Sequence, residues 1–356
     1  MMNLFYDDKK EQENSFRKMW KTVFGDTERY IDFYYKNMYS KNQVMAAQNQ
    51  KEIVGMIHLN PYKMQVGKER LDLHYIVGVA TLEKYRRQGI MREMLLRCMS
   101  DMAKNNEVFT YLMPANKAYY EPFDFAFVQS FASEEIKSCK YQDNSRLQPL
   151  KKELYKSACE FLNGYLRKHY KVYTWIDEKY LNQLWEECLC EDGEILVLQE
   201  CGKVKGFCCY GQEDKIYIRQ MFADDILQMK EEIAAYFPKK QIEITLDGKS
   251  QGKKAYIMVR ILRLDLLLPM MKGKREHHFV IRIRDRYLEH QNGTFQIHVR
   301  VDGCSIEPSD VNVDVAIDIL DLTKLLFGYD CEALLVQYPD FGWINPLSPV
   351  MIGEII

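Results

Sequence analysis

The stretch Arg86-Arg87-Gln88-Gly89-Ile90-Met91 places two arginines and a glycine between a β-branched run and an amphipathic segment. The N-terminus of a helix presents unpaired backbone N–H groups and a partial positive charge, and both favour an anion. Gly89 would let the backbone approach that anion closely, and guanidinium groups form paired hydrogen bonds with phosphate oxygens. The stretch therefore predicts a diphosphate site, with a helix start flanked by solvated arginines as the alternative. It has neither the GxGxxG pattern of dinucleotide-binding folds nor the GK[ST] of P-loops.

Two further groups suit acid–base chemistry. Tyr120 lies in the run YYEPFDF, and a phenol, with a pKa near 10, can act as a proton donor. The last residues, VMIGEII, are apolar apart from Gly353 and Glu354, so we expect this end to be docked against the protein interior. A tyrosine packed in the core and a tail that is merely packed are the alternatives. No Ser-His-Asp or Cys-His arrangement is evident, and direct group transfer needs none.

Length and composition bound the class of protein. A chain of 356 residues exceeds one ordinary core, which favours two or three domains. The net charge of −2 provides no basic field, so we expect no nucleic-acid partner. No apolar run is long enough for a membrane span, and the first residues lack the apolar core of a secretory signal. The 10 cysteines and 7 histidines show no metal-ligand spacing, so we expect no metal, free thiols and a cytoplasmic location.

Hydrophobic periodicity predicts a pattern of elements that occurs twice. Helices are expected at 15–24 and 28–39, a three-stranded meander over 43–82, a helix at 90–103, and strands from 107 to about 135. Helices at 149–169 and 177–189, a meander over 194–223 and a helix at 224–237 repeat this order, which suggests an internal duplication. The second copy has FADD where the first has the arginine-glycine stretch, so it cannot hold the same anion in the same way.

A third unit is expected from about residue 272. Strands are predicted within 277–287, 293–303 and 313–319, with the run HQNG as a hairpin turn between the first two. A helix stopped by glycine follows within 318–330.

A strand, RRQGIM and a helix, followed by a strand and a tyrosine-bearing run, resemble the Gcn5-related N-acetyltransferase (GNAT) family, whose motif is R/Q-x-x-G-x-G/A. Met91 departs from the final small residue of that motif. The YYEPFDF run and the three-unit order resemble the Eis-type acetyltransferases more specifically, although Asp124 replaces a glycine. This resemblance implies an α/β (α+β) fold: tandem GNAT-like domains with mixed sheets, followed by a sterol-carrier-like (SCP2-like) α/β domain. The implied boundaries are 1–140 for the catalytic domain, 141–271 for a degenerate GNAT-like domain and 272–356 for the third.

The resemblance also implies roles for individual residues. Val79, Ala80 and Thr81 would lie along the pantetheine arm of acetyl-CoA, and Ala115 and Asn116 would contact the cofactor beside the next strand. Tyr120 would be the general acid, and the terminal carboxylate of Ile356 the base, with Glu354 as the rival carboxylate. The diphosphate would be wrapped by Arg86, Arg87, Gln88, Gly89, Ile90, Met91 and Arg92.

The function implied is an acetyl-CoA-dependent N-acetyltransferase that acts on a primary amine of a cationic small molecule or a lysine-like acceptor. The resemblance implies a homo-oligomer, and related enzymes suggest a hexamer. One alternative is a small-molecule or lipid-binding protein that uses a catalytically silent GNAT scaffold. Another is a regulator or adaptor that docks partners, although no interaction segment is evident for it.

Overall fold

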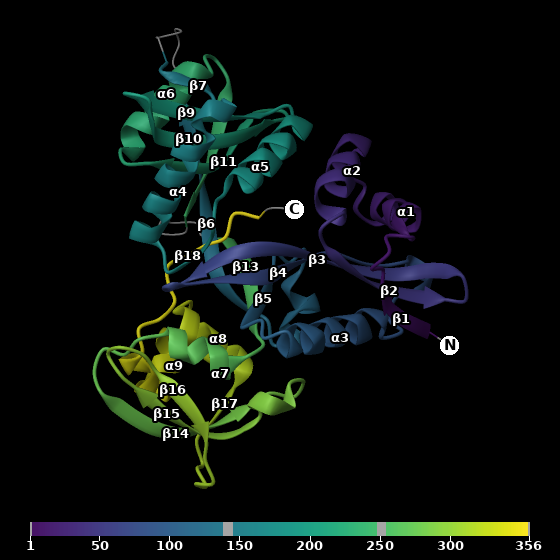
Figure 1. Cartoon of the computed structure of the whole chain (residues 1–356), viewed down its shortest axis with the longest axis vertical. Helices are drawn as coiled ribbons and strands as arrows, with labels where there is room; N and C mark the ends of the chain where they lie inside the picture. The colour runs from purple at the N-terminus through teal and green to yellow at the C-terminus, as the bar shows by residue number, and fades with distance from the viewer. Residues whose placement is uncertain (1, 138–144, 248–253, 355–356) are drawn as a thin grey trace.

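A computed structural model of the chain describes residues 2–137, 145–247 and 254–354, and it has three parts (Figure 1). The N-terminal part, purple to blue, carries α3 on one side of its sheet and α1 and α2 on the other. A teal and green part carries α4, α5 and α6. The yellow-green part holds a separate four-stranded sheet with α7, α8 and α9, and from it the chain returns to the middle of the molecule.

The N-terminal part contains the helices and the meander that the sequence predicts. Phe16, Met19 and Trp20 are buried on one face of the first helix, and the left-handed Gly25 ends it. A short π-helix, Tyr35–Tyr39, continues the second helix. The elements are β1 (Met2–Tyr6), α1 (Glu13–Phe24), α2 (Glu28–Tyr34), β2 (Gln43–Asn49), β3 (Glu52–Val66), β4 (Glu69–Thr81), α3 (Ile90–Lys104), β5 (Phe109–Leu112) and β6 (Ala126–Lys137).

The second part repeats the predicted order of helices, meander and helix. Its elements are β7 (Leu147–Pro149), α4 (Tyr155–His169), β8 (Val172–Thr174), α5 (Glu178–Cys190), β9 (Glu194–Glu200), β10 (Lys203–Gln212), β11 (Ile216–Ala223), α6 (Ile226–Tyr236), β12 (Gln241–Asp247) and β13 (Lys254–Ile261). Its strands join those of the first part and the short C-terminal strand β18 (Val350–Met351) in one 14-stranded sheet.

The strands predicted up to about residue 135 do not complete the sheet of the first part by themselves. β13 lies between β5 and β6 in the sheet, and β6 pairs with β12 on its other side. The first part therefore completes its sheet with a strand that is more than a hundred residues distant in sequence. Such pairing is long-range and leaves no local signal. The boundaries 1–140, 141–271 and 272–356 stay a prediction.

The third part contains α7 (Leu264–Leu267), β14 (His277–Arg284), β15 (Gly293–Val299), β16 (Ser305–Pro308), β17 (Ala316–Asp318), α8 (Ile319–Phe327), α9 (Glu332–Gln337) and β18 (Val350–Met351). Gly328, in the left-handed region, ends α8 as expected. The hairpin predicted at HQNG is present, but its connection is longer than a turn at these four residues. β14 and β15 pair antiparallel, and the loop that joins them contains the 3₁₀ helix Glu289–Gln291.

The mixed α/β class is confirmed by this architecture. Within the described ranges, no helix is both long enough and apolar enough to cross a membrane.

Candidate active site

The site begins where two neighbouring parallel strands separate. β4 and β5 pair only at Tyr75 and Tyr111, whereas β3 follows β4 to Thr81 on its other side. Beyond Tyr75, no strand of the described residues therefore pairs with the backbone of β4 on the β5 side. Backbone N–H and C=O groups need hydrogen-bond partners, so this open edge suits an extended ligand. The predicted pantetheine residues Val79, Ala80 and Thr81 lie on it.

A β-bulge at Gly78 shapes the open edge. The register between β3 and β4 shifts here, since His58 faces Val77 but Met56 faces Ala80. Gly78 has a φ of +58°, and a Cβ placed on it would lie 2.6 Å from a ring carbon of Trp20. Glycine is required here both by backbone conformation and by space.

We expect Gly78→Ala to lower the free energy of unfolding by about 2 to 4 kcal/mol, because backbone strain adds to overpacking against Trp20. Gly25→Ala is the matched control, since Gly25 also has a positive φ (+76°) but nothing lies within 4 Å of the added Cβ. It should cost only about 1 kcal/mol. Urea denaturation of both variants measures the difference, and equal losses would contradict the packing explanation.

The N-terminus of α3 lies at the end of this strand. Gly89 is the N-cap residue, with φ +83°, and a Cβ on it would meet nothing within 4 Å. Its carbonyl accepts the first helical hydrogen bond from Glu93, while the amides before that turn point out of the helix end. Arg86, Arg87 and Gln88 are exposed beside it, and Arg87 also has a positive φ (+62°). The start of α3 therefore combines open space, backbone amides and positively charged side chains, which are the features of an anion site.

Two of these exposed side chains brace the turn. Arg86 Nε donates to the carbonyl oxygen of Thr81 (3.1 Å), and Gln88 Nε2 donates to the carbonyl oxygen of Lys84 (3.2 Å). The turn is therefore tied to the end of β4. Of the remaining predicted diphosphate residues, Ile90 is buried in the core, Met91 is half-buried and Arg92 is exposed.

The segment after β5 brings in the candidate acid. Because β4 and β5 run parallel, their carboxyl ends lie at the same edge of the sheet. Ala115 and Asn116 are exposed there, and Asn116 Oδ1 accepts from the amide of Ala118 (3.0 Å) to cap a short 3₁₀ helix. Tyr120 follows and is 8% exposed. No described residue hydrogen-bonds to its hydroxyl, and burial raises the pKa of Tyr120, so the phenol stays protonated at neutral pH.

The C-terminal tail docks against β8, β6 and β11. β18 pairs parallel with β8, and Gln129 then exchanges two hydrogen bonds with the backbone of Ile352 (2.9 and 3.2 Å). Gln220 Nε2 donates to the carbonyl oxygen of Gly353 (3.1 Å). The expectation of a docked end is therefore confirmed through Glu354. Ile356, the predicted base, lies outside the described residues.

Glu354 is a buried carboxylate beside the point where the strands part. It is 4% exposed, and its Oε2 accepts from the Thr174 hydroxyl (2.9 Å). Both that hydroxyl and the hydroxyl of Tyr111 contact the sulfur of Met64, which links the carboxylate to the Tyr75–Tyr111 pair. Oε1 is buried without a hydrogen bond from any described residue. Burial raises the pKa of Glu354 from its ordinary 4.5 to about 7, although the Thr174 hydrogen bond opposes the shift.

This raised pKa predicts how stability depends on pH. Between about pH 4.5 and 7 the folded state binds the Glu354 proton more tightly than the unfolded state, so stability falls as the pH rises through this window. The rise corresponds to about 3 kcal/mol. Glu354→Gln should therefore match the parent protein near pH 4.5 and exceed its free energy of unfolding above pH 7 by up to that amount. Urea denaturation at both pH values tests this. The same difference at both would show that Glu354 does not titrate in this way.

A pocket of about 500 Å³ adjoins the tail. Gly353 forms part of its wall, together with Tyr256, whose hydroxyl is buried without a partner among the described residues. Two cations in its lining are neutralised, because Arg219 pairs with Glu187 (2.7 Å) and Lys230 pairs with Glu134 (2.7 Å). Its other aromatic lining residues are Phe131, Tyr165, Tyr170 and Phe222.

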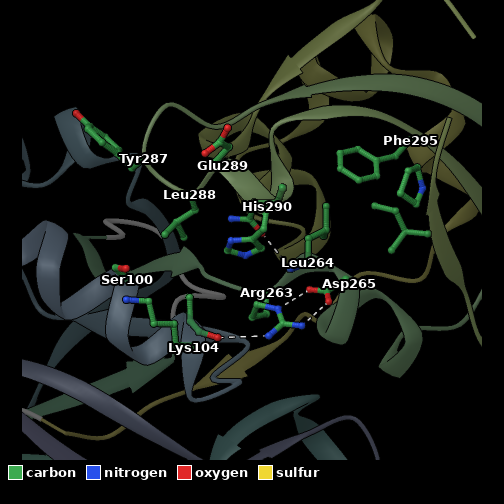
Figure 2. A pocket seen from close by; sticks show the side chains of 14 residues that line it. Ser100, Lys104, Arg263, Leu264, Asp265, Tyr287, Leu288, Glu289, His290 and Phe295 are labelled. Atoms are coloured by element: carbon green, nitrogen blue, oxygen red, sulfur yellow. Dashed lines mark hydrogen bonds and ion pairs between the residues drawn. The ribbon is translucent and has the colours of Figure 1, made fainter. Parts of the chain in front are cut away.

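A larger pocket of about 740 Å³ lies elsewhere, between the C-terminal half of α3 and the third part (Figure 2). Ser100 and Lys104 of α3 line it together with Leu288 and Phe295 of the third part. None of the predicted site residues lines it. It is therefore a separate cavity from the open edge of β4.

The side chains that surround Glu354 carried no sequence signal. Thr174, Met64 and Tyr111 come from three different strands and meet only in the folded chain. Within the described part of the chain, no three His, Cys, Asp or Glu side chains lie close enough together to hold a metal ion.

Comparison with known families agrees with this geometry. Residues 8–128 match the acetyltransferase (GNAT) domain, and the open edge, the helix end and Tyr120 all lie within that range. Residues 266–338 match the sterol carrier protein domain. The chain therefore carries an acyltransferase domain of the GNAT class. More particularly, a GNAT acetyltransferase domain lies in its N-terminal part and a sterol carrier protein domain lies in its third part. No curated protein sequence matches the chain significantly.

Solved structures share the fold over nearly the whole chain. A GCN5-related N-acetyltransferase from Anabaena variabilis superposes with a TM-score of 0.81 at 14% identity, covering 99% of this chain and 100% of its own. A probable N-acyltransferase from Enterococcus faecalis gives 0.79 at 14%, covering 97% and 94%. Eis1 from Mycobacterium abscessus gives 0.71 at 14%, covering 98% and 94%. The three-unit order that resembled Eis-type enzymes is thus confirmed as a fold.

Proposed function

We propose that the chain transfers the acetyl group of acetyl-CoA directly to a primary amine of a cationic small molecule or a lysine-like acceptor. The observation that carries this proposal is the glycine-capped end of α3 at the open edge of β4. The amides at residues 87–92 would hold the diphosphate, and Val79 to Thr81 would form hydrogen bonds with the pantetheine arm. Ala115 and Asn116 would flank the arm at the end of β5. The residues present fit this co-substrate. Gly89 leaves space at the start of α3, and no strand of the described residues covers the open edge of β4.

The proposed reaction needs one acid and one base. The amine nitrogen attacks the thioester carbonyl carbon, the C–S bond breaks, and Tyr120 donates its hydroxyl proton to the departing thiolate. A carboxylate takes the proton that the nitrogen loses, and solvent returns a proton to Tyr120. The phenol of Tyr120 is protonated at neutral pH, as a proton donor must be, while burial raises its pKa and so lowers its acidity.

We assign the base to the terminal carboxylate of Ile356, two residues beyond the last described residue. The docked path of the tail supports this assignment, because the chain enters the region of the Tyr75–Tyr111 pair. Glu354 remains the second carboxylate. Its pKa of about 7 would suit a general base, but its burial and its bond to Thr174 also fit a purely structural role.

The acceptor would occupy the 500 Å³ pocket beside Gly353. Aromatic faces attract an ammonium group by cation–π interaction, and the lining offers several. Because the cations in the lining are already paired with carboxylates, they would not repel a positively charged acceptor. As the resemblance implies, we also expect a homo-oligomer, and we propose the hexamer of related enzymes as its form. We place the protein in the cytoplasm, as its cysteine content suggests.

A thiol-release assay with purified protein, acetyl-CoA and a panel of amines tests the function. The panel should hold polyamines, an aminoglycoside, arylalkylamines and a lysine peptide, with acetyl-CoA alone as the control. We expect at least one amine to accelerate thiol release and to gain 42 Da by mass spectrometry. Failure of every amine, together with no thermal shift by acetyl-CoA, would favour the alternative of a silent scaffold.

That alternative, a small-molecule or lipid-binding protein, has one observation in its favour. The 740 Å³ cavity next to the third part has apolar side chains in its lining, among them Leu264, Leu288 and Phe295. A thermal shift by fatty acids that Phe295→Ala abolishes, with no thiol release from any amine, would support it.

A further inference from the structure

The turn that carries Tyr120 has an unusual residue at its end. Asp124 adopts φ +63° and ψ +29°, a left-handed conformation in which glycine would be unstrained. Its side chain is only 8% exposed. A buried carboxylate in a strained position must be held by partners, and these partners come from outside the GNAT domain.

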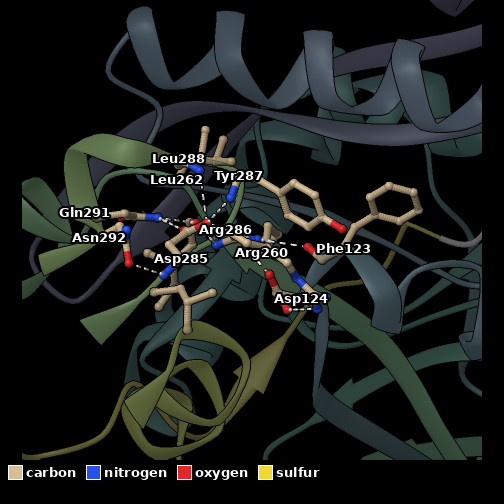
Figure 3. Close-up of polar contacts among 12 residues, drawn as sticks. Phe123, Asp124, Arg260, Leu262, Asp285, Arg286, Tyr287, Leu288, Gln291 and Asn292 are labelled. Atoms are coloured by element: carbon tan, nitrogen blue, oxygen red, sulfur yellow. Dashed lines mark hydrogen bonds and ion pairs between the residues drawn. The ribbon is translucent and has the colours of Figure 1, made fainter. Parts of the chain in front are cut away.

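The loop after β14, in the sterol carrier domain, contacts the turn at residues 122–124 (Figure 3). Arg286 Nη2 donates to Asp124 Oδ1 (2.9 Å), and the Tyr287 hydroxyl donates to the carbonyl oxygen of Pro122 (2.8 Å). The ring of Tyr287 also packs on Phe123, with centroids 5.8 Å apart. This one loop thus contacts the backbone of Pro122, the ring of Phe123 and the carboxylate of Asp124.

A buried arginine supports both the loop and the turn. Arg260, in β13, is fully buried; its Nε donates to the carbonyl oxygen of Phe123 (2.9 Å), and its Nη2 donates to both carboxylate oxygens of Asp285 (2.7 Å each). Asp285 also accepts from the amides of Tyr287 and Leu288 and from Gln291. Burial alone would raise the pKa of Asp285, but Arg260 together with the hydrogen bonds from Tyr287 and Gln291 holds this pKa below its usual value.

The turn passes this constraint to Tyr120. The carbonyl oxygen of Tyr120 accepts from the amides of Phe123 (2.9 Å) and Phe125 (3.4 Å), so its backbone is part of the same hydrogen-bonded turn. The ring packs edge-on against Phe125 at 5.9 Å. The contacts that hold residues 122–124 therefore also set the direction in which the Tyr120 side chain extends from the backbone.

We propose that Asp124 and Arg286 are positioning residues, through which the sterol carrier domain sets the orientation of Tyr120 for proton donation. This inference rests on the proposed function of Tyr120 as general acid. Loss of either residue would leave acetyl-CoA binding intact, because the helix end and open edge that would hold it lie in other segments. It would slow the chemical step, since small displacements of a reacting group lower the rate strongly.

Two variants test the proposal with little risk to folding. Arg286 is 62% exposed, so Arg286→Ala removes little buried structure, and Asp124→Gly removes the carboxylate at a φ that glycine adopts freely. We expect each to lower kcat about tenfold, with KM for acetyl-CoA unchanged. Arg286→Lys should recover at least half of the parent kcat by keeping the charge. Arg282→Ala, which removes an exposed arginine of β14 just before this loop, is the control and should leave kcat unchanged.

A double variant separates positioning from general stabilisation. In a Tyr120→Phe background, Arg286→Ala should have no further effect on kcat, because the group that it positions is gone. A full tenfold loss in that background, or no loss in either single variant, would overturn the positioning role. If instead Tyr120→Phe alone leaves kcat unchanged, the proposed acid is wrong, and with it the basis of the inference. The two failures are therefore distinguishable.

Discussion

Replacing Tyr120 with phenylalanine is expected to lower kcat by about 100-fold or more while KM for acetyl-CoA stays within twofold. The loss follows because a positioned general acid contributes about 10² to 10⁴ in rate, and phenylalanine has no proton to give to the leaving thiolate. Binding should survive, since the amides at the start of α3 and the edge of β4 lie in other segments. Steady-state thiol release at several acetyl-CoA concentrations measures both constants.

Tyr119→Phe is the matched control for this variant. Tyr119 is the preceding residue and is 57% exposed, whereas Tyr120 is 8% exposed. We expect the Tyr119 variant to keep the parent kcat. If Tyr120→Phe also keeps it, another group must protonate the thiolate and the acid assigned here is wrong.

Extending the chain by a few residues beyond Ile356 is expected to lower kcat by about 100-fold. The extension moves the terminal carboxylate away from the site, and the tail that bears it is docked from Val350 to Glu354 by strand pairing and side-chain hydrogen bonds. An intein fusion that releases the native terminus should restore activity in the same sample. Thiol release before and after release of the fusion measures the effect.

The same extension at the other end is the control. The N-terminal strand β1 lies at the edge of the sheet, away from the tail (Figure 1). A tag there should leave kcat unchanged. A fully active C-terminal extension would exclude the terminal carboxylate as base. A large loss of kcat in Glu354→Gln would then assign that role to Glu354.

The elements were predictable where the signal is local. The helices of the first two parts and both meanders follow from apolar spacing, and the ends at Gly25 and Gly328 follow from glycine in the left-handed region. The insertion of β13 between β5 and β6 was not predictable, because it joins residues more than a hundred positions apart. The same holds for β18, only two residues long, which is placed by β8 rather than by its own pattern.

The candidate site divides in the same way. The diphosphate site at the arginine-glycine stretch could be predicted, because a strand, a turn and a helix follow one another directly. Asp124 was visible only as a departure from a glycine, and the ion pair with Arg286 that accounts for it spans 162 residues. The buried Arg260–Asp285 pair and the surroundings of Glu354 likewise depend on contacts between parts of the chain that no local pattern connects.

A crystal structure of the protein with coenzyme A tests the central claim most directly. The account predicts the diphosphate on the backbone amides around Gly89, with the pantetheine arm along Val79 to Thr81 and its sulfur directed toward Tyr120. Coenzyme A bound elsewhere, such as in the cavity between α3 and the third part, with the start of α3 left empty, would contradict it.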